Sequence, residues 1–296
     1  MDESTNDAMP IYVGIDGSVP ALEAARWAGE YAARIRRSVV LVHSLPDVTW
    51  YLGTGVLAGE QEILGELREV GRQALDAAER AVREVNPSID LRAVQTRKSV
   101  TDYFESVSDD AHVIVVGSRR SSALTDLVLG GEVIRVCNSV ECPVLVWRAH
   151  SADDADADMP VVVGVDGTES SNHALRAAFE FADTVKAPVI ATHAWQIAES
   201  VGVGYAAGLI DWDRLRSDQR QWLRDTVNPI ADSFADVAVT CASVEGQAAH
   251  HLRTLSASAQ LVVVGSRGRG KMAGALLGSV SQNMIHHAQC PVLVVH

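Results

Sequence analysis

The chain has 296 residues, a formal net charge of −13 and four cysteines. This length accommodates two domains, each large enough to bury a hydrophobic core. The excess of acidic groups argues against binding to nucleic acid or to an anionic membrane, because both require a basic surface. The polar, acidic segment 1–7 differs from a signal peptide, and no apolar run approaches the ~20 residues that span a bilayer. We therefore expect a soluble, cytoplasmic protein.

The first half alternates short runs rich in valine and isoleucine with longer segments of helical periodicity. Continuous apolar runs predict strands that are buried on both faces, as in a parallel sheet covered by crossover helices. Ser18 is expected to cap the first helix, with Pro20 in its first turn, where a missing N–H is tolerated. The expected strands are 11–15, 39–43, 89–94, 112–116 and 144–146.

A polar, acidic stretch at 150–158 has no apolar period and is expected to link two domains, 1–149 and 159–296. Thr168 is expected to cap the first helix of the second domain. The strands expected there are 161–165, 189–193, 238–243, 261–264 and 292–295. The predicted class is therefore α/β, with two tandem Rossmann-like units. Each is a five-stranded, mostly parallel sheet with helices on both faces.

The two halves repeat one another at nearly constant spacing. Gly14 recurs as Gly164, 150 residues later, and Cys142 recurs as Cys290, 148 residues later. Two such copies predict two domains of one fold. Because the repeated cysteines each precede a proline and an apolar strand, we interpret them as buried hydrophobic residues rather than as disulfide or zinc ligands.

The segment Gly265–Lys271 carries the clearest chemical signal. A predicted buried strand opens directly into it, and its glycines allow the backbone to approach a ligand closely. Successive N–H groups in such a loop bind anions, and Arg267, Arg269 and Lys271 add positive charge. Downstream, Gly278-Ser279 precedes a helical pattern and places N–H groups at a positive helix terminus. Two anion-binding elements in sequence suit a polyphosphate.

The same segment also begins like a P-loop, since Gly265, Gly270 and Lys271 have the GxxxxGK spacing. A P-loop continues with a serine or threonine that binds Mg²⁺, whereas Met272 follows here. The segment also follows the fourth predicted strand rather than the first. We therefore do not interpret it as a P-loop.

The order Gly265-x2-Gly268-x9-Gly278-Ser279 resembles the nucleotide loop of the ATP-binding universal stress proteins. Val161–Gly167 resembles the family's opening motif and Cys290–Val295 its last strand, so the likeness covers nearly the whole chain as a tandem protein. The resemblance implies flavodoxin-like units that bind ATP, with or without Mg²⁺, at the carboxyl ends of the strands, and it implies a homodimer. The matching residues of the second half are Gly164, Asp166, Thr168, Gly265, Ser266, Arg267, Gly268, Arg269, Gly270, Lys271, Gly278, Ser279 and Val280.

The first half departs from this pattern, because Arg120 stands where Gly268 stands and Gly131-Glu132 replaces Ser279-Val280. A carboxylate beside the expected phosphate is repulsive, although Arg120 could supply a bidentate phosphate contact. We therefore expect the second half to bind ATP well, and the first half weakly or with another ligand. The matching residues of the first half are Gly14, Asp16, Ser18, Gly117, Ser118, Arg119, Arg120, Gly130 and Gly131.

Histidines offer few further candidates. His43 and His193 end equivalent strands and are interpreted as hydrogen-bonded residues at the core edge rather than as catalytic bases. Adjacent histidines at 250–251 and 286–287 point in different directions on a helix, which argues against a metal pair. No Ser/His/Asp order or carboxylate pair recurs between the halves, so the sequence indicates no nucleophile.

The sequence thus predicts an ATP-binding regulator or sensor of the stress response, whose nucleotide-bound form is read by a protein partner that it does not identify. One alternative is a slow ATPase or a nucleotide-dependent transferase. Another is a dimerisation scaffold with vestigial sites. The sequence does not distinguish ATP from other adenine nucleotides such as AMP or cyclic AMP.

Overall fold

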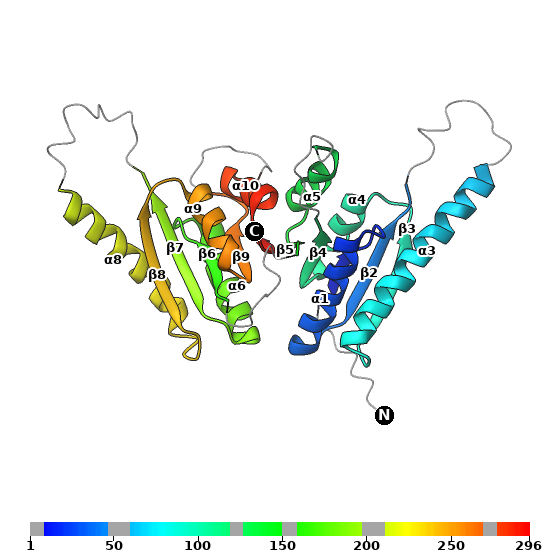
Figure 1. Cartoon of the computed structure of the whole chain (residues 1–296), viewed down its shortest axis with the longest axis horizontal. Helices are drawn as coiled ribbons and strands as arrows, with labels where there is room; N and C mark the ends of the chain where they lie inside the picture. Colours follow the sequence, from blue (N-terminus) through cyan, green and yellow to red (C-terminus); the bar gives the residue numbers. More distant parts are fainter. Residues whose placement is uncertain (1–8, 47–59, 119–126, 150–158, 197–210, 269–276) are drawn as a thin grey trace. The chain divides into compact units, whose positions relative to one another are not determined.

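The structure is a computed structural model that describes residues 9–46, 60–118, 127–149, 159–196, 211–268 and 277–296. The chain divides into two compact units, an N-terminal unit of residues 1–149 and a C-terminal unit of residues 150–296 (Figure 1). Each unit is an α/β domain and is described by itself. The expected linker at 150–158 lies outside the described residues.

In the N-terminal unit, five strands alternate with helices. The strands are β1 (Ile11–Gly14), β2 (Val39–Ser44), β3 (Leu91–Thr96), β4 (Val113–Gly117) and β5 (Val144–Trp147). The helices are α1 (Val19–Ile35), α3 (Glu60–Val85), α4 (Val100–Glu105) and α5 (Leu127–Ser139), with a 3₁₀ turn, η1 (Ser108–Asp110), before β4.

The strands of this unit lie in the order β3-β2-β1-β4-β5, and all four neighbouring pairs are parallel. Ile11 of β1 pairs with Val39 of β2 on one side and with Val113 of β4 on the other. The strand order therefore reverses at β1, and the carboxyl ends of β1 and β4 flank the point where open α/β sheets bind ligands.

The C-terminal unit repeats this arrangement. Its strands are β6 (Val161–Gly164), β7 (Val189–Trp195), β8 (Val239–Glu245), β9 (Leu261–Gly265) and β10 (Val292–Val295). Its helices are α6 (Glu169–Val185), α8 (Trp212–Ala231), α9 (Ala248–Leu255) and α10 (Ser279–His287), with the 3₁₀ turn η4 (Ser256–Ser258) before β9.

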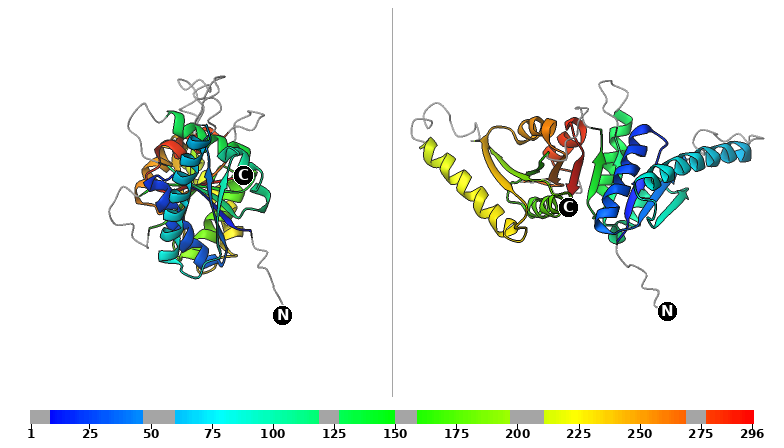
Figure 2. Two further views of the ribbon diagram at one scale, coloured as in Figure 1. Left: turned by 90° about the vertical axis from the view of Figure 1, so that its right-hand side faces the viewer. Right: turned by 60° about the horizontal axis from the view of Figure 1, so that its bottom comes forward.

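Here the strand order is β8-β7-β6-β9-β10, again with parallel pairs throughout. Val163 of β6 pairs with Val263 of β9, so the ends of these two strands form the equivalent switch point. Helices α6 and α8 pack together on one face of the sheet, and α9 and α10 pack together on the other. The right-hand view of Figure 2 shows the strands between these two helical layers.

The burial of the strands explains why the sequence predicted them well. β9 and β10 are apolar along their length, and their valines are nearly inaccessible to solvent. In the part of the chain that the structure describes, ten strands form where ten were expected, with ends displaced by at most two residues. The predicted α/β class, with five parallel strands in each unit, is confirmed.

Helix starts also agree with the predicted caps. The hydroxyl of Ser18 accepts a hydrogen bond from the N–H of Ala21, and that of Thr168 accepts one from Ser171. Cys142 and Cys290 are buried free thiols, as interpreted from the sequence. None of the described helices is long and apolar enough to cross a membrane.

Gly117 ends β4 against the first turn of α1, which leaves no room for a side chain. A Cβ at this position would lie 2.6 Å from the nitrogen of Ala21 and 2.8 Å from the carbonyl oxygen of Pro20. Because these are backbone atoms, Gly117→Ala is expected to lower the free energy of unfolding by about 1–3 kcal/mol, as measured by urea denaturation. Gly131→Ala is the control, since a Cβ there meets nothing within 4 Å. Equal stability of the two variants would contradict this packing.

Candidate functional site

A tight turn that contains Asp166 follows β6. Gly167 has a φ of +80°, a conformation that favours glycine. The Asp166 Oδ1 accepts hydrogen bonds from the Thr168 N–H at 3.0 Å and from the Thr168 hydroxyl at 2.7 Å. The Asp166 N–H donates to the hydroxyl of Ser171 at 3.0 Å. The turn thus fixes a half-buried carboxylate at the carboxyl end of β6.

The segment after β9 is fastened to two neighbouring elements. The Ser266 N–H donates to the Val295 carbonyl, at the end of β10, at 2.6 Å. The Ser266 carbonyl accepts from the N–H of Gly278 at 2.8 Å. Ser281 adds a side-chain bond, because its hydroxyl donates to the Gly265 carbonyl at 2.6 Å. The start of the glycine-rich segment and the start of α10 are therefore held side by side.

Three motif positions converge as a result. A Cβ on Gly268 would lie 3.0 Å from the Oδ2 of Asp166, and a Cβ on Gly278 would lie 3.4 Å from the nitrogen of Gly268. The carboxylate, the glycine-rich segment and the helix start thus meet at the switch point of the C-terminal sheet. Arg267 beside them is exposed to solvent. Residues 269–271 lie outside the described residues.

The start of α10 has the character of an anion-binding terminus. Its N-cap is Gly278, which has no side chain to accept hydrogen bonds from the first turn. The N–H groups of Ser279 and Val280 therefore have no side-chain cap from residue 278. They lie at the positive end of α10, a helix of nine residues. The predicted positions of Gly278, Ser279 and Val280 at a helix start agree with the structure.

The N-terminal unit reproduces the carboxylate turn. Gly17 has a φ of +80°, and the Ser18 N–H donates to the Asp16 Oδ1 at 2.9 Å. Asp16 is exposed, whereas Asp166 is half-buried. The N–H of Ser118, which follows Gly117, donates to the Trp147 carbonyl at 2.8 Å. This unit therefore shares the turn and the strand-end bond of the other.

The units differ at the positions of Gly130-Gly131 and the matching Gly278-Ser279. Gly130 and Gly131 lie inside α5, which begins at Leu127, whereas the matching Gly278 precedes α10. A glycine inside a helix does not present the free N–H groups of a helix start. Glu132 on α5 forms an exposed ion pair with Arg135 at 3.3 Å. Arg119 and Arg120 lie outside the described residues.

The histidines occupy structural positions. The Nδ1 of His43 lies 2.7 Å from the Ile15 carbonyl, and that of His193 lies 2.6 Å from the Val165 carbonyl. Both are hydrogen-bonded at the core edge, as interpreted from the sequence. Burial, and then the neighbouring His250, lower the pKa of His251. Among the described residues, no group of three or more His, Cys, Asp or Glu could hold a metal ion.

Serines that hold the site together were missed by the sequence analysis. Ser170 donates from its hydroxyl to the Val295 carbonyl at 3.0 Å, and Ser171 and Ser281 bind the backbone beside Asp166 and Gly265. The signal was the paired serines in the first turn of α6 and the serine two residues after Ser279. The sequence analysis assigned only Ser18 and Thr168 as helix caps and made no assignment for these three serines.

The fold defines a tandem α/β protein whose motif residues gather at the carboxyl ends of parallel strands. The universal stress protein family model matches residues 8–148 and again 159–296. The chain therefore belongs to the universal stress protein family.

Similar proteins extend over the same length. The chain is 34% identical to the universal stress protein Rv2623 of Mycobacterium tuberculosis over 304 residues, which cover 98% of this chain and 97% of the relative. It is 32% identical to Rv2005c of the same organism over 294 residues, 96% of each chain. A solved universal stress protein from Archaeoglobus fulgidus has a TM-score of 0.68 over 98% of both chains, at 15% identity, which indicates a shared fold.

The buried hydroxyl of Ser281 gives a test of how the site is assembled. Ser281→Ala removes the bond to Gly265 and is expected to lower the free energy of unfolding by about 1–2 kcal/mol, since a half-buried carbonyl loses this donor. Hydrogen exchange at the Gly278 amide is expected to accelerate. Ser258→Ala is the control, because that hydroxyl makes an exposed bond at 3.5 Å. Unchanged exchange at Gly278 in Ser281→Ala would contradict the assignment.

Proposed function

We propose that this chain is an ATP-binding regulator of the stress response, with its principal nucleotide site in the C-terminal unit. The observation that supports the proposal is the convergence of Asp166, Gly268 and Gly278 at the switch point of one parallel sheet. This is the place where open α/β sheets bind nucleotides. Family membership supports the same conclusion.

The shape of the site fits a phosphate chain. A Cβ at Gly268 would project to within 3.0 Å of the Asp166 carboxylate, so glycine keeps this cradle open. The N–H of Gly268 and the first turn of α10 supply donors for phosphate oxygens. Arg267, with Arg269 and Lys271 close in sequence, offsets the negative charge of ATP.

Asp166 has two roles in this proposal. Its Oδ1 is engaged by Thr168, which orients the carboxylate. Its Oδ2 faces Gly268, where it would accept a hydrogen bond from a nucleotide hydroxyl. If Mg²⁺ accompanies the nucleotide, a carboxylate oxygen is a ligand of the type that this ion takes. Adenine recognition is assigned to backbone groups at the strand ends.

The N-terminal unit is proposed to bind ATP weakly. Helix α5 runs through Gly130 and Gly131, and Glu132 is the next residue of the same helix. The backbone donors of a helix start are thus replaced by helical hydrogen bonds. A carboxylate near this edge further disfavours phosphate.

The proposed output is regulatory. ATP would join the Asp166 turn to the segment at Gly268 and stabilise the bound form, which a partner protein then reads. The described histidines nearest the site bond to backbone carbonyls or, in His251, to the Thr192 hydroxyl. Neither is placed by these contacts as a general base for hydrolysis. Homodimerisation remains a prediction from the family resemblance.

Calorimetric titration of the full chain with ATP tests the proposal. We expect one tight site per chain, because among the described residues the glycine-capped start of α10 lies beside the carboxylate turn of the C-terminal unit, whereas Gly130 and Gly131 of the N-terminal unit lie inside α5. Asp166→Ala is expected to weaken that site by at least about tenfold, since a charged hydrogen bond contributes ~1.5–3 kcal/mol. Asp16→Ala is the matched control and should leave the tight site unchanged.

Each alternative has its own outcome. Two equal tight sites would contradict the asymmetry, and tighter binding of AMP or cyclic AMP would change the assigned ligand. Absence of binding would instead favour a scaffold with vestigial sites. Steady phosphate release that Asp166→Ala abolishes would favour an ATPase.

A further inference from the structure

The equivalent histidines at the ends of β2 and β7 have a common bonding pattern. The Nδ1 of His193 lies 2.6 Å from the Val165 carbonyl, and that of His43 lies 2.7 Å from the Ile15 carbonyl. A carbonyl oxygen only accepts hydrogen bonds, so Nδ1 of each ring carries the proton and donates it. In both units the acceptor belongs to the residue directly before the aspartate of the site.

His193 completes the attachment of Val165 to the neighbouring strand. The Val165 N–H donates to the Thr192 carbonyl at 2.8 Å, and the Val165 carbonyl accepts from His193. Both backbone groups of Val165 are thus held by consecutive residues of β7. The peptide plane that joins Val165 to Asp166 is therefore held in place, which constrains the backbone from which the Asp166 side chain leaves.

The His193 ring also meets a long helix, α8. The centroid of the His193 ring lies 4.4 Å from that of the Trp222 ring on α8, and the two ring planes form an angle of 55°. The imidazole is 2% exposed. It therefore lies between the carboxylate turn and α8 as a rigid, buried connection.

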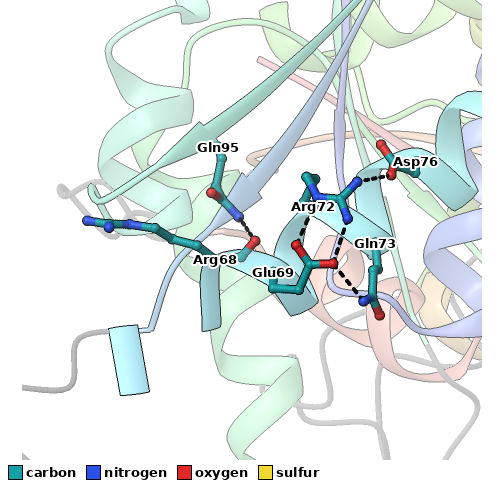
Figure 3. A network of polar contacts seen from close by, with 6 residues as sticks. All are labelled: Arg68, Glu69, Arg72, Gln73, Asp76 and Gln95. Carbon is teal, nitrogen blue, oxygen red and sulfur yellow. Dashed lines mark hydrogen bonds and ion pairs between the residues drawn. The ribbon is translucent and has the colours of Figure 1, made fainter. Parts of the chain in front are cut away.

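In the N-terminal unit the helix contact has a different character. Gly71 of α3 meets the ring of His43, since a Cβ there would lie 2.5 Å from the His43 Cδ2. Gln95 of β3 also reaches α3, because its Nε2 donates to the Arg68 carbonyl at 3.0 Å (Figure 3). Arg72 ties successive turns of the same helix together through its ion pairs with Glu69 and Asp76.

The N-terminal histidine thus meets a helix through glycine, and the C-terminal one through tryptophan. Closely packed aromatic rings cannot move independently, because a shift of one removes the contacts of the other. The glycine contact offers no such side chain. The two units therefore provide the same backbone bond with two different helix contacts.

We propose that His193 is a positioning residue for the nucleotide site. Its Nδ1–H holds the Val165 carbonyl and so orients the Asp166 carboxylate, and its ring couples the state of that turn to Trp222 on α8. This inference rests on the proposed function, because it concerns the same site. When ATP binds to the Asp166 turn, it shifts the peptide plane to which His193 is hydrogen-bonded. The environment of the Trp222 indole, which packs against His193, changes as a result.

Three substitutions separate the hydrogen bond from general stability. His193→Leu removes the donor and is expected to weaken ATP binding about tenfold by calorimetry. His193→Asn carries an amide nitrogen near the position of Nδ1 and should restore affinity to within about threefold of the wild type. His43→Leu, the control, removes the matching bond in the other unit and should leave the tight site unchanged.

Fluorescence measures the coupling to α8. The contribution of Trp222 is obtained as the difference between the wild type and Trp222→Phe. This contribution is expected to change when ATP saturates the wild type and to stay constant in His193→Leu at saturating ATP. If His193 were merely structural, the ATP-dependent fluorescence change of Trp222 would be the same in the wild type and in His193→Leu, since both proteins contain Trp222.

The outcomes are distinct. His193→Leu with wild-type affinity, or His193→Asn as weak as the leucine variant, would overturn the proposal. Equal losses in His43→Leu would also overturn it, since the effect would then be one of general stability. If the leucine variant does not fold, His193→Gln replaces it, because its amide lies near the Nε2 position and misses Val165. A wild type that binds no ATP overturns the proposed function and this inference together, whereas indifferent variants of an ATP-binding wild type overturn the inference alone.

Discussion

The close approach of α6 to the end of β9 is the constraint on which the C-terminal site depends. A Cβ on Gly265 would lie 2.5 Å from the Ser170 hydroxyl and 2.9 Å from the Ser170 carbonyl carbon. Because glycine leaves this space empty, the first turn of α6 lies directly over the strand end. From there Ser170 reaches the end of β10, and the Asp166 turn comes next to Gly268. Any side chain at Gly265 would separate these parts.

The N-terminal unit retains the close approach of its first helix to the strand end, but it lacks the Ser170 hydroxyl that binds the neighbouring strand in the C-terminal unit. Gly117 lies equally close to the first turn of α1, where Pro20 stands in place of Ser170. Proline preserves the packing, yet it offers no hydroxyl to bind the neighbouring strand. In addition, α5 runs through Gly130 and Gly131, whereas α10 begins after Gly278. The same sheet topology therefore carries different backbone groups near the carboxyl ends of its strands. Duplication has thus conserved the fold while the strand ends diverged.

The local signals were strong wherever burial or capping acts on neighbouring residues. Apolar runs identified the ten strands, since parallel strands are covered on both faces. Ser18 and Thr168 were identifiable as caps, because the bonds that they accept come from three residues away. The resemblance to the family motif identified Asp16 and Asp166, but the tight turns that contain them were found only in the structure. Strand ends were less certain, since ladder bonds depend on the neighbouring strand.

The sequence by itself determined the fold class, the internal repeat and the segments that carry the site, because each depends on periodicity or on contacts between near neighbours. Only the tertiary structure decided that Asp166, Gly268 and Gly278 meet, since strand order and register bring them together. It also decided that Ser170 and Ser281 hold the backbone there, and that His193 connects Val165 to Trp222. These contacts join residues far apart in the chain, and no local pattern encodes the distance between them.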